Sequence, residues 1–419
     1  MAARAPSGTH DVLWPESTRW EALLAAFTSL VERAGYGLAH TPTFEDVRVF
    51  RRGIGEGSDV VGKEMYEFED RGGRTLALRP EGTAPIVRAF VQHRPPLPWK
   101  AWYATPAFRY ERPQAGRYRQ FYQAGSEAIG FADPASDAES IAMLVTALRE
   151  LGLKDLVVDI NSVGDAETRA VYRERLLEFL NGWTGSMSAE SRARMGTNPL
   201  RVLDSKDKDD QELVAFAPKV TNHLSTHSSA HFAAVLRHLD RLGIPYEVNK
   251  KLVRGLDYYT DTVFEVLSND LGAQSAVAGG GRYDGLVGEF QAQGRPAVGW
   301  GIGLDRLTWL LEQRQLMAGT SGSDVAVITL GQVCFGRGLA LAQALREAGL
   351  RACFDASGLR SMKNQFKQAD TEGCRLALVL GEDELSRGEA AIKDMKTGEQ
   401  SAIRLEHALD EIQRRLGAA

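Results

Sequence analysis

The sequence predicts a protein that combines strands and helices in several domains, and three observations support this prediction. Aromatic and alternating polar residues flank a Pro-Gly turn, a pattern typical of a β-hairpin over residues 108–127. Charged helical patterns with few aromatic residues indicate an inserted helical module over 165–238. From Asp324 onwards, strands alternate with helices as in an α/β domain. With 419 residues, the chain has room for roughly two to four domains.

The composition excludes several classes of protein. Hydrophobic residues make up 43% of the chain and charged residues 25%, which is ordinary for a globular protein. The formal net charge of -5 argues against a generally basic nucleic-acid-binding protein. We expect neither an export signal nor a membrane span, because the N-terminal segment lacks an apolar region and no run approaches about eighteen apolar residues.

The cysteines indicate the compartment. Cys334, Cys353 and Cys374 lie far apart and form no CxxC pair. This spacing fits neither a disulfide framework nor a zinc site, so we expect a reducing cytoplasm.

Hydrophobic spacing predicts the first elements of the chain. Apolar residues at helical intervals predict a helix over 17–34. Residues 36–49 are predicted to form a strand interrupted by Pro42, and a proline in a strand lies at an edge, a bulge or an interface. Further elements are expected as a strand over 74–79, a helix over 86–93, a helix over 137–151 and a strand over 156–163.

Two motifs that often mark nucleotide or metal sites carry little weight here. Residues 57–63 match the start of a phosphate-binding P-loop, but Glu64 stands where a Ser or Thr must hold magnesium. His223, His227 and His231 repeat every four residues and could bind a metal from one helix face. No glutamate follows the HExxH spacing, so a solvated helix face is the favoured interpretation.

The predicted hairpin carries the first candidate site. Its returning strand places side chains of one parity on one face: Arg117, Arg119, Phe121, Gln123 and Glu127. Gln123 and Glu127 would lie roughly 13 Å apart along the strand and could bracket a small polar ligand over Gly125. On the outgoing strand, Arg109 and Glu111 alternate with aromatic residues. A solvated hairpin held by cross-strand ion pairs is the alternative.

The segment Arg79-Pro-Glu-Gly-Thr83 carries a second candidate site. Pro80 lacks an amide proton and Gly82 lacks a side chain, so the carboxylate of Glu81 can approach a ligand closely. A carboxylate there suits an ammonium group. Thr83 can also be the N-cap of the following helix, and both interpretations can hold together.

Two later stretches place cations and phenols at the ends of strands. Arg254 precedes a glycine, and Tyr258 and Tyr259 follow before a β-branched strand. Arg306 lies in the first turn of a helix predicted over 303–311, where the backbone dipoles favour an anion such as phosphate.

These residues together indicate a type of chemistry. Arg109, Arg254 and Arg306 are three cations near glycine-rich strand ends, and Glu81 and Glu127 supply carboxylates. The set fits phosphoryl chemistry on a nucleotide beside a zwitterionic substrate.

Several motifs resemble those of a known enzyme class. The segment FRYERPQAGRYRQF resembles motif 2 of class II aminoacyl-tRNA synthetases, AVGWGIGLDRL resembles motif 3, and the strand around Pro42 resembles motif 1, which builds the dimer interface in that class. More narrowly, RPEGT, TNPLRVLDSK, LVRGLDYYTDTVFE and GGGRYDGL are similar to segments of histidyl-tRNA synthetases. The resemblance covers nearly the whole chain.

The resemblance implies a fold and a division into domains. The expected fold is α+β, with an antiparallel sheet flanked by helices, an inserted helical domain and a C-terminal α/β anticodon-binding domain. We expect the catalytic core at 1–164 and 239–320, the inserted domain at 165–238 and the anticodon-binding domain at 324–419.

It also implies a histidine pocket. Matched by position, Glu81, Thr83 and Gln123 would hold the ammonium group of L-histidine, Glu127 and Tyr259 would contact the imidazole nitrogens, and Tyr258 and Tyr283 would line the pocket. A site that satisfies both ring nitrogens leaves buried polar groups unpaired when another amino acid enters, which can reject competitors by roughly 10⁴-fold.

The same resemblance implies the chemistry of ATP. Arg109 would hold the α-phosphate, Arg306 the γ-phosphate, and Arg254 would stand beside the attacking carboxylate, with Mg²⁺ on the leaving pyrophosphate. The implied partners are tRNA(His), L-histidine, ATP and a second copy of the chain in a homodimer.

The C-terminal domain contains a short basic face. Arg360, Lys363 and Lys367 fall at helical spacing and could meet tRNA phosphates. On charge alone, a solvated face is the favoured interpretation. Similarity of RSMKNQFKQAD and ALVLGEDE to the family's anticodon domain favours tRNA instead.

Two other functions share parts of this pattern. A synthetase-like regulatory subunit of ATP phosphoribosyltransferase has this fold and binds histidine, but it usually lacks the anticodon domain and the catalytic arginines. Another class II synthetase with a similar C-terminal domain would lack LVRGLDYY. The segments that resemble the anticodon domain, the three candidate catalytic arginines and LVRGLDYY are all present in this chain.

Overall fold

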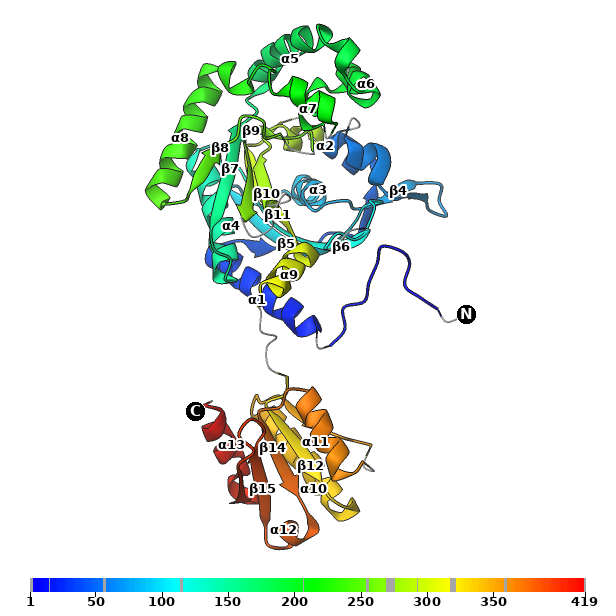
Figure 1. Ribbon diagram of the computed structural model, residues 1–419, viewed down its shortest axis with the longest axis vertical. Helices are drawn as coiled ribbons and strands as arrows, with labels where there is room; N and C mark the ends of the chain where they lie inside the picture. The colour runs from blue at the N-terminus through cyan, green and yellow to red at the C-terminus, as the bar shows by residue number, and fades with distance from the viewer. Residues whose placement is uncertain are drawn as a thin grey trace. The chain divides into compact units, whose positions relative to one another are not determined.

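An eight-stranded sheet forms the centre of the larger of two units into which the chain divides (Figure 1). The computed structural model describes residues 3–14, 16–55, 58–113, 116–205, 207–253, 256–268, 276–291, 293–316, 322–357 and 360–417. The larger unit is built mainly from Leu23–Leu316 and the smaller one mainly from the residues after it.

The order of strands in this sheet is β1-β5-β6-β11-β10-β9-β7-β8. The strands are β1 (Gly37–Leu38), β5 (Trp99–Phe108), β6 (Gln120–Ile129), β7 (Leu156–Ser162), β8 (Tyr246–Val248), β9 (Thr260–Ser268), β10 (Ala276–Arg282) and β11 (Ala297–Gly303). The pairs β1–β5 and β7–β8 at the two edges are parallel, and the central pairs are antiparallel. The predicted antiparallel sheet flanked by helices is therefore confirmed.

Helices cover the two faces of the sheet differently (Figure 1). One face carries α1 (Glu16–Arg33), α4 (Ala135–Glu150) and α9 (Leu304–Gln313). There, the ring of Phe27 meets Trp102 and Trp300 edge-on, at centroid distances of 5.8 and 5.6 Å. On the opposite face, Ile86 of α3 (Thr83–His93) packs against Tyr103. Neighbouring residues of a strand point to opposite faces of the sheet. Trp102 therefore faces the core formed with α1, α4 and α9, and Tyr103 faces the side that carries the candidate site.

The hairpin of β5 and β6 is confirmed, but both strands end before the predicted turn, and β5 begins upstream of the predicted hairpin. Phe108 pairs with Gln120, and beyond this pair the Arg109 amide donates to the Arg119 carbonyl at 2.8 Å. The Arg119 amide donates instead to the Gly8 carbonyl at 2.7 Å. This competing partner ends the ladder at Arg119, so neither strand reaches the predicted turn.

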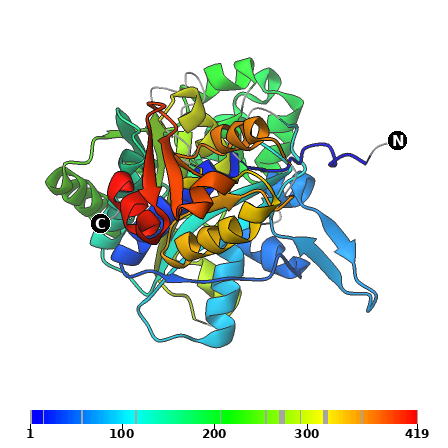
Figure 2. The same ribbon diagram turned by 90° about the horizontal axis from the view of Figure 1, so that it is seen from below.

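The predicted strand over 36–49 is only partly correct. It divides into β1 and β2 (Phe44–Asp46), and the helix α2 (Val47–Ile54) begins where the strand was expected to continue. The Asp46 side chain accepts the Arg48 amide at 2.9 Å and caps this helix, which ends the strand. A small sheet forms in the order β2-β4-β3, with β3 (Glu67–Glu69) and β4 (Thr75–Leu78) as a hairpin that projects from the body in both views (Figure 1, Figure 2).

A helical segment follows β7 and has its own apolar core. Its elements are α5 (Ala166–Asn181), η2 (Thr184–Ser186), α6 (Ala189–Thr197), η3 (Pro199–Asp204), α7 (Lys208–Val214) and η4 (Val220–Asn222). Buried residues from Tyr172 to Val220 form one hydrophobic cluster. The next helix, α8 (Thr226–Leu242), packs against α4 of the core.

The three histidines do not lie on one solvated helix face. His223 follows η4 and precedes α8, with its ring 6.1 Å from that of Tyr172. His231 is buried on α8, with Nε2 3.4 Å from the Asp137 carboxylate. The predicted solvated face is therefore wrong for His231, because α4 covers this side of the helix.

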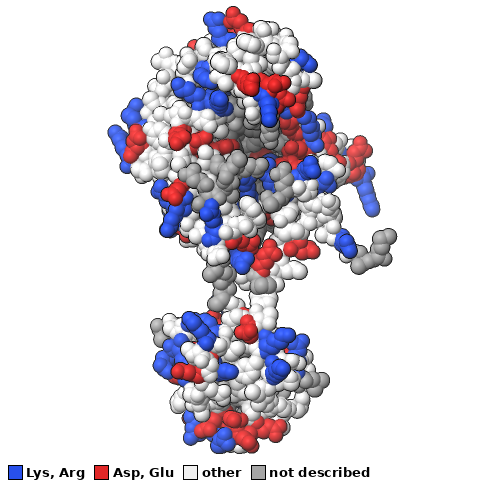
Figure 3. Space-filling model, in the orientation of Figure 1, with Lys and Arg blue, Asp and Glu red and all other residues white. Residues whose placement is uncertain are grey.

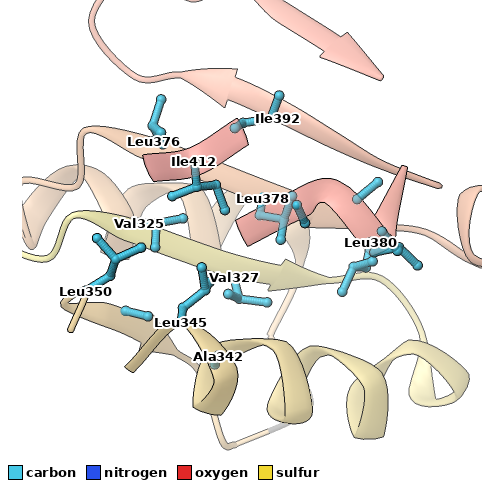
Figure 4. Close-up of a cluster of buried hydrophobic side chains, with 14 of the residues drawn as sticks. Val325, Val327, Ala342, Leu345, Leu350, Leu376, Leu378, Leu380, Ile392 and Ile412 are labelled. Atoms are coloured by element: carbon cyan, nitrogen blue, oxygen red, sulfur yellow. The ribbon is translucent and has the colours of Figure 1, made fainter. Parts of the chain in front are cut away.

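The smaller unit is an α/β domain, as predicted. Its sheet has the order β13-β12-β14-β15-β16, with β12 (Val325–Thr329) parallel to β13 (Ala352–Phe354) and β14 (Leu376–Leu380), followed by the antiparallel β15 (Glu389–Asp394) and β16 (Gln400–Arg404). Its helices are α10 (Gln332–Glu347), α11 (Met362–Thr371), α12 (Glu382–Ser386) and α13 (Ala408–Leu416). Val325, Leu378 and Ile412 lie in the core between the sheet and the helices α10 and α13 (Figure 4).

Membrane-spanning helices are not found in the part of the chain that the structure describes.

Candidate active site

A small polar cavity of about 70 Å³ opens on the face of the sheet that carries α3. Every residue predicted to bind substrate lines it, together with one of the predicted catalytic arginines: Glu81, Thr83, Gln123, Glu127, Tyr258, Tyr259, Tyr283 and Arg109. A larger cavity of about 1040 Å³ lies among α1, α4 and α8, but alanines and other apolar residues form much of its lining. The small cavity is the better candidate because acids, phenols and a cation converge on it.

Glu127 is the central polar group of the cavity. It lies on β6 with 1% of its surface exposed and accepts hydrogen bonds from the hydroxyls of Thr83, at 2.7 Å, and Tyr283. Burial and, to a smaller extent, the nearby Glu81 raise the pKa of Glu127 to about 8, although the two hydroxyl donors act in the opposite direction. The carboxyl group therefore changes its charge near neutral pH, which is typical of a functional site.

Glu81 supports the cavity from the start of α3. Its carboxylate accepts the backbone amides of Thr83 at 2.7 Å and Ala84 at 2.8 Å. The helix begins at Thr83, with Gly82 as its N-cap, so Thr83 is not the cap and the helix is longer than predicted; the Glu81 carboxylate satisfies two of its first amides. Burial raises the pKa of Glu81, while the two backbone donors favour its charged form.

Gln123 and Arg109 are fixed by the backbone of the same segment. The Gln123 side-chain carbonyl accepts the Gly82 amide at 2.9 Å, and Arg109 Nε donates to the Pro80 carbonyl at 2.8 Å. The Arg109 guanidinium also lies 5.5 Å from the centroid of the Phe121 ring. Both side chains are thus preorganised at the cavity.

A buried ion pair supports Tyr283. The preceding residue, Arg282, has 1% of its surface exposed and pairs with Asp137 of α4, which also contacts His231 of α8. These contacts join the end of β10 to two helices. They hold the neighbouring Tyr283 in position to donate to Glu127.

Sequence reasoning missed Tyr103 of β5. Tyr103 pairs with Gly125 across the hairpin, and its ring occupies space that only glycines leave open. A Cβ atom on Gly82 would lie 2.2 Å from this ring, and one on Gly125 would lie 2.4 Å from its hydroxyl. The glycine in the hairpin was the available signal, because the cross-strand register identifies the residue that fills its gap.

Two glycines of β11 leave room for the polar side chains. A Cβ atom on Gly299 would lie 1.8 Å from Glu127 Oε2, and one on Gly301 would lie 2.7 Å from Gln123 Nε2. The antiparallel register places these glycines opposite Glu127 and Gly125.

Gly299→Ala is therefore expected to reduce amino-acid-dependent ATP–pyrophosphate exchange by about 10²-fold, because a displacement of about 1 Å at a site can have this effect. The matched control is Gly303→Ala on the same strand, where no heavy atom lies within 4 Å of the added Cβ position. Equal activity of the two variants would contradict the proposed position of the site.

The predicted catalytic arginines lie in different places. Arg109 lines the cavity. Arg306 lies in the first turn of α9. A Cβ atom added to Gly116, which follows β5, would lie 3.1 Å from the Arg306 Cα, so the two residues are in close contact. Burial and the neighbouring Arg117 lower the pKa of Arg306. Arg254 lies outside the described residues.

The predicted tRNA-binding residues lie in the smaller unit. Lys363 and Lys367 are exposed on α11, and Arg360, just before this helix, pairs with Asp355 at 3.3 Å. Basic side chains gather over α11 in Figure 3, and acidic ones gather over α12.

Comparisons with known proteins agree with this architecture. The family model for histidyl-tRNA synthetase matches residues 8–307, and the model for an anticodon binding domain matches residues 324–415. The chain is 47% identical to the histidine–tRNA ligase of Synechococcus elongatus over 403 residues, which cover 96% of this chain and 92% of that protein. It is 43% identical to the histidine–tRNA ligase of Halothermothrix orenii over 418 residues, which cover 99% of this chain and 100% of that protein.

A solved structure shows the same similarity. The apo histidyl-tRNA synthetase of S. aureus superposes with a TM-score of 0.82 at 33% identity, covering 98% of this chain and 100% of that one. The two family models together match most of the sequence. The chain therefore belongs to the histidyl-tRNA synthetase family.

Proposed function

We propose that the chain is a histidine–tRNA ligase, which activates L-histidine with ATP to histidyl-adenylate and pyrophosphate and then transfers the histidyl group to the 3′ end of tRNA(His). The observation that carries this proposal is the cavity in which two buried carboxyl groups, one arginine and several phenols converge. Family membership supports the reaction, and the cavity supplies groups suited to its amino-acid substrate.

The cavity suits histidine at both ends of the molecule. Glu81, Thr83 and Gln123 would bind the ammonium group, and Glu81 is kept in place by the amides of α3. Glu127 and Tyr259 would bind the imidazole nitrogens, with Tyr258 and Tyr283 as walls. The rings of Tyr258 and Tyr259 lie 4.6 Å apart, and those of Tyr258 and Tyr283 lie 5.7 Å apart, which supports a shared aromatic wall.

The activation step requires positioning and charge neutralisation. The carboxylate of histidine attacks the α-phosphate in line, forming a bond to phosphorus while the bond to the pyrophosphate oxygen breaks. No protein base is needed, because the nucleophile is already ionised. Arg109 would neutralise the α-phosphate, Arg254 would contact both reacting groups, and Arg306, at the N-terminus of α9, would bind the γ-phosphate.

ATP would enter as its Mg²⁺ complex. Both carboxyl groups of the cavity already accept hydrogen bonds from the protein and are buried. Because Mg²⁺ commonly keeps several waters and binds substrate phosphates, the ion would be held mainly by ATP.

The segment that resembles motif 1 supports a homodimer. It forms the edge strand β1 and the strand β2, and Leu38 and Phe44 are apolar side chains with 62% and 51% of their surface exposed. A second copy of the chain would cover these side chains.

In the smaller unit, Arg360, Lys363 and Lys367 would contact tRNA phosphates. We place the enzyme in the cytoplasm, without membrane attachment.

Histidine affinity is expected to be greatest between about pH 6.5 and 8. Glu127, which has Glu81, Tyr103 and Tyr283 as its titratable neighbours, has a pKa of about 8, and the free imidazole has a pKa of about 6.5. The complex needs one proton between the carboxyl group and the ring. Below about pH 6.5 the free Glu127 carboxyl and the free imidazole are both protonated, so binding must release a proton. Above about pH 8 neither carries its titratable proton, so binding must take one up.

Equilibrium binding of histidine from pH 5.5 to 9 measures this profile. In Glu127→Gln the decline above about pH 8 should disappear, because glutamine does not titrate. Affinity that continues to rise up to pH 9 in the unmodified chain would contradict this account of the pocket.

Aminoacylation of a tRNA(His) transcript with labelled histidine and ATP tests the complete function. The proposal expects label on tRNA(His) and none on transcripts for other amino acids. A folded chain that binds histidine without charging tRNA would instead support a regulatory role. The presence of Arg109 in the cavity and of an anticodon-binding domain favours the ligase.

A further inference from the structure

Two cysteines that are distant in the sequence meet in the smaller unit. The Sγ atoms of Cys353 on β13 and Cys374 before β14 lie 3.5 Å apart. A carboxylate oxygen of Glu372 joins them, and all three ligand atoms lie within 4.8 Å of one another. Among the residues that the structure describes, this is the one cluster of at least three such groups close enough to hold a metal ion.

The geometry favours a metal ion over a disulfide. Zinc–sulfur bonds of about 2.3 Å at a tetrahedral angle place two sulfurs roughly 3.8 Å apart, close to the observed separation. Cys353 lies on β13 and Cys374 lies two residues before β14, and both of these strands pair with β12. A disulfide bond is only about 2.05 Å long, so the two sulfurs are not bonded at the observed separation. A disulfide would therefore require the two sulfurs to move about 1.5 Å closer together, whereas a metal ion could bind them where they lie.

The carboxylate of Glu372 is held in place. Gln368 Nε2 donates to Glu372 Oε1 at 2.7 Å, and Gln368 Oε1 accepts from Arg360 Nη1 at 3.1 Å. Second contacts of this kind orient the ligands of metal sites. Cys353 and Glu372 are only half-buried and Cys374 is buried, so water can reach the cluster from one side.

We propose that Cys353, Cys374 and Glu372 bind one thiophilic divalent ion of the Zn²⁺ type, with water as the fourth ligand. On binding, the two S–H bonds break, both protons pass to the solvent, and two metal–sulfur bonds form, so no oxidant is needed. The ion would tie the C-terminal end of α11 to β13. It would thereby brace the helix that carries Lys363 and Lys367.

Titration of the full chain with Co²⁺, after treatment with a chelator and its removal, tests this site. The expected result is a thiolate-to-Co²⁺ charge-transfer band that saturates at one ion per chain and is lost when Zn²⁺ is added. Cys353→Ser and Cys374→Ser should each remove the band. Gln368→Ala should keep it with affinity weakened about 10-fold, because it disturbs only the orientation of Glu372.

Cys334→Ser is the matched control. Cys334 is buried on α10 and is not part of the cluster, so its replacement should leave the Co²⁺ band intact. The thermal unfolding of each variant, compared with that of the unmodified chain, checks that the smaller unit is folded, because pyrophosphate exchange reports only on the other unit. Cys353→Ser is the decisive variant. The Cys353 side chain is only half-buried, so its replacement should disturb the folded domain less than that of the buried Cys374.

Two results would overturn the proposal. One is a Co²⁺ titration without a thiolate band, or with a band that persists in Cys353→Ser. The other is a loss of two hydrogens from the mass of the chain purified without reductant, mapped to a Cys353–Cys374 peptide, which would identify a disulfide pair. A higher melting temperature with Zn²⁺ in the unmodified chain, absent in Cys353→Ser, would provide independent support.

Discussion

Replacing Arg109 with alanine is expected to lower histidine-dependent ATP–pyrophosphate exchange by at least about 10²-fold. Arg109 lines the cavity and is fixed by the Pro80 carbonyl and the Phe121 ring. A preorganised guanidinium can neutralise charge that develops on phosphorus without rearranging in the transition state. Alanine removes that charge, so the loss should fall mainly on the rate of exchange, with a smaller change in histidine affinity.

The control for this variant is Arg74→Ala. Arg74 pairs with Asp70 on the projecting hairpin, and 77% of its side chain is exposed. Its loss should leave exchange within about twofold of the unmodified chain, because exposed ion pairs contribute little. If a folded Arg109→Ala chain keeps more than about a tenth of the exchange rate, the proposed role of Arg109 is wrong.

Glu127→Gln is expected to reduce histidine-dependent exchange by roughly 10²- to 10⁴-fold, mostly through weaker histidine binding. The carboxyl group accepts from Thr83 and Tyr283, and in the proposed complex it also binds the imidazole. The glutamine amide places an N–H₂ donor where acceptors are required. A buried donor or hydroxyl is then left without a partner, at a cost of about 1–3 kcal/mol for each group.

The same substitution, although it weakens histidine binding, should make the folded chain more stable relative to the unmodified chain as the pH rises. The pKa of Glu127 is raised from 4.5 to about 8 by burial, so the folded chain binds one more proton than the unfolded chain between these values. Stability from this group is fully present below about pH 4.5 and decreases as pH rises through 8. Glutamine does not titrate, so urea unfolding should show the variant gaining on the unmodified chain between pH 6 and 9.

Glu67→Gln is the matched control for both measurements. Glu67 lies on β3 of the small sheet, pairs with Arg51 of α2 and does not line the cavity. Glu127→Gln activity equal to that of this control, or a constant stability difference from pH 6 to 9, would contradict the account of Glu127.

Local periodicity predicted which side chains of the returning strand share one face, and the family resemblance supplied the proposed histidine-binding role. Gln123, Gly125 and Glu127 alternate on one strand, so a common face follows from the two-residue period. The structure brings Gln123 and Glu127 together with Glu81 and Tyr283 in one cavity. The role of each residue in that cavity stays a prediction until the variants are measured.

Distant partners account for what the sequence could not predict. The hairpin strands end early because the Arg119 amide pairs with Gly8, more than a hundred positions away. The strand expected over 36–49 stops at Asp46 because a capping side chain starts a helix there. His231 is buried by Asp137, and Cys353 meets Cys374, through contacts that no local pattern encodes.

The most direct measurement of the proposed function is ATP–pyrophosphate exchange with each of the twenty amino acids in turn. The proposed recognition of an imidazole by Glu127 and Tyr259 predicts that L-histidine alone supports rapid exchange, with every other amino acid at least about 10³-fold slower. Comparable exchange with another amino acid, or tight histidine binding without any exchange, would contradict it.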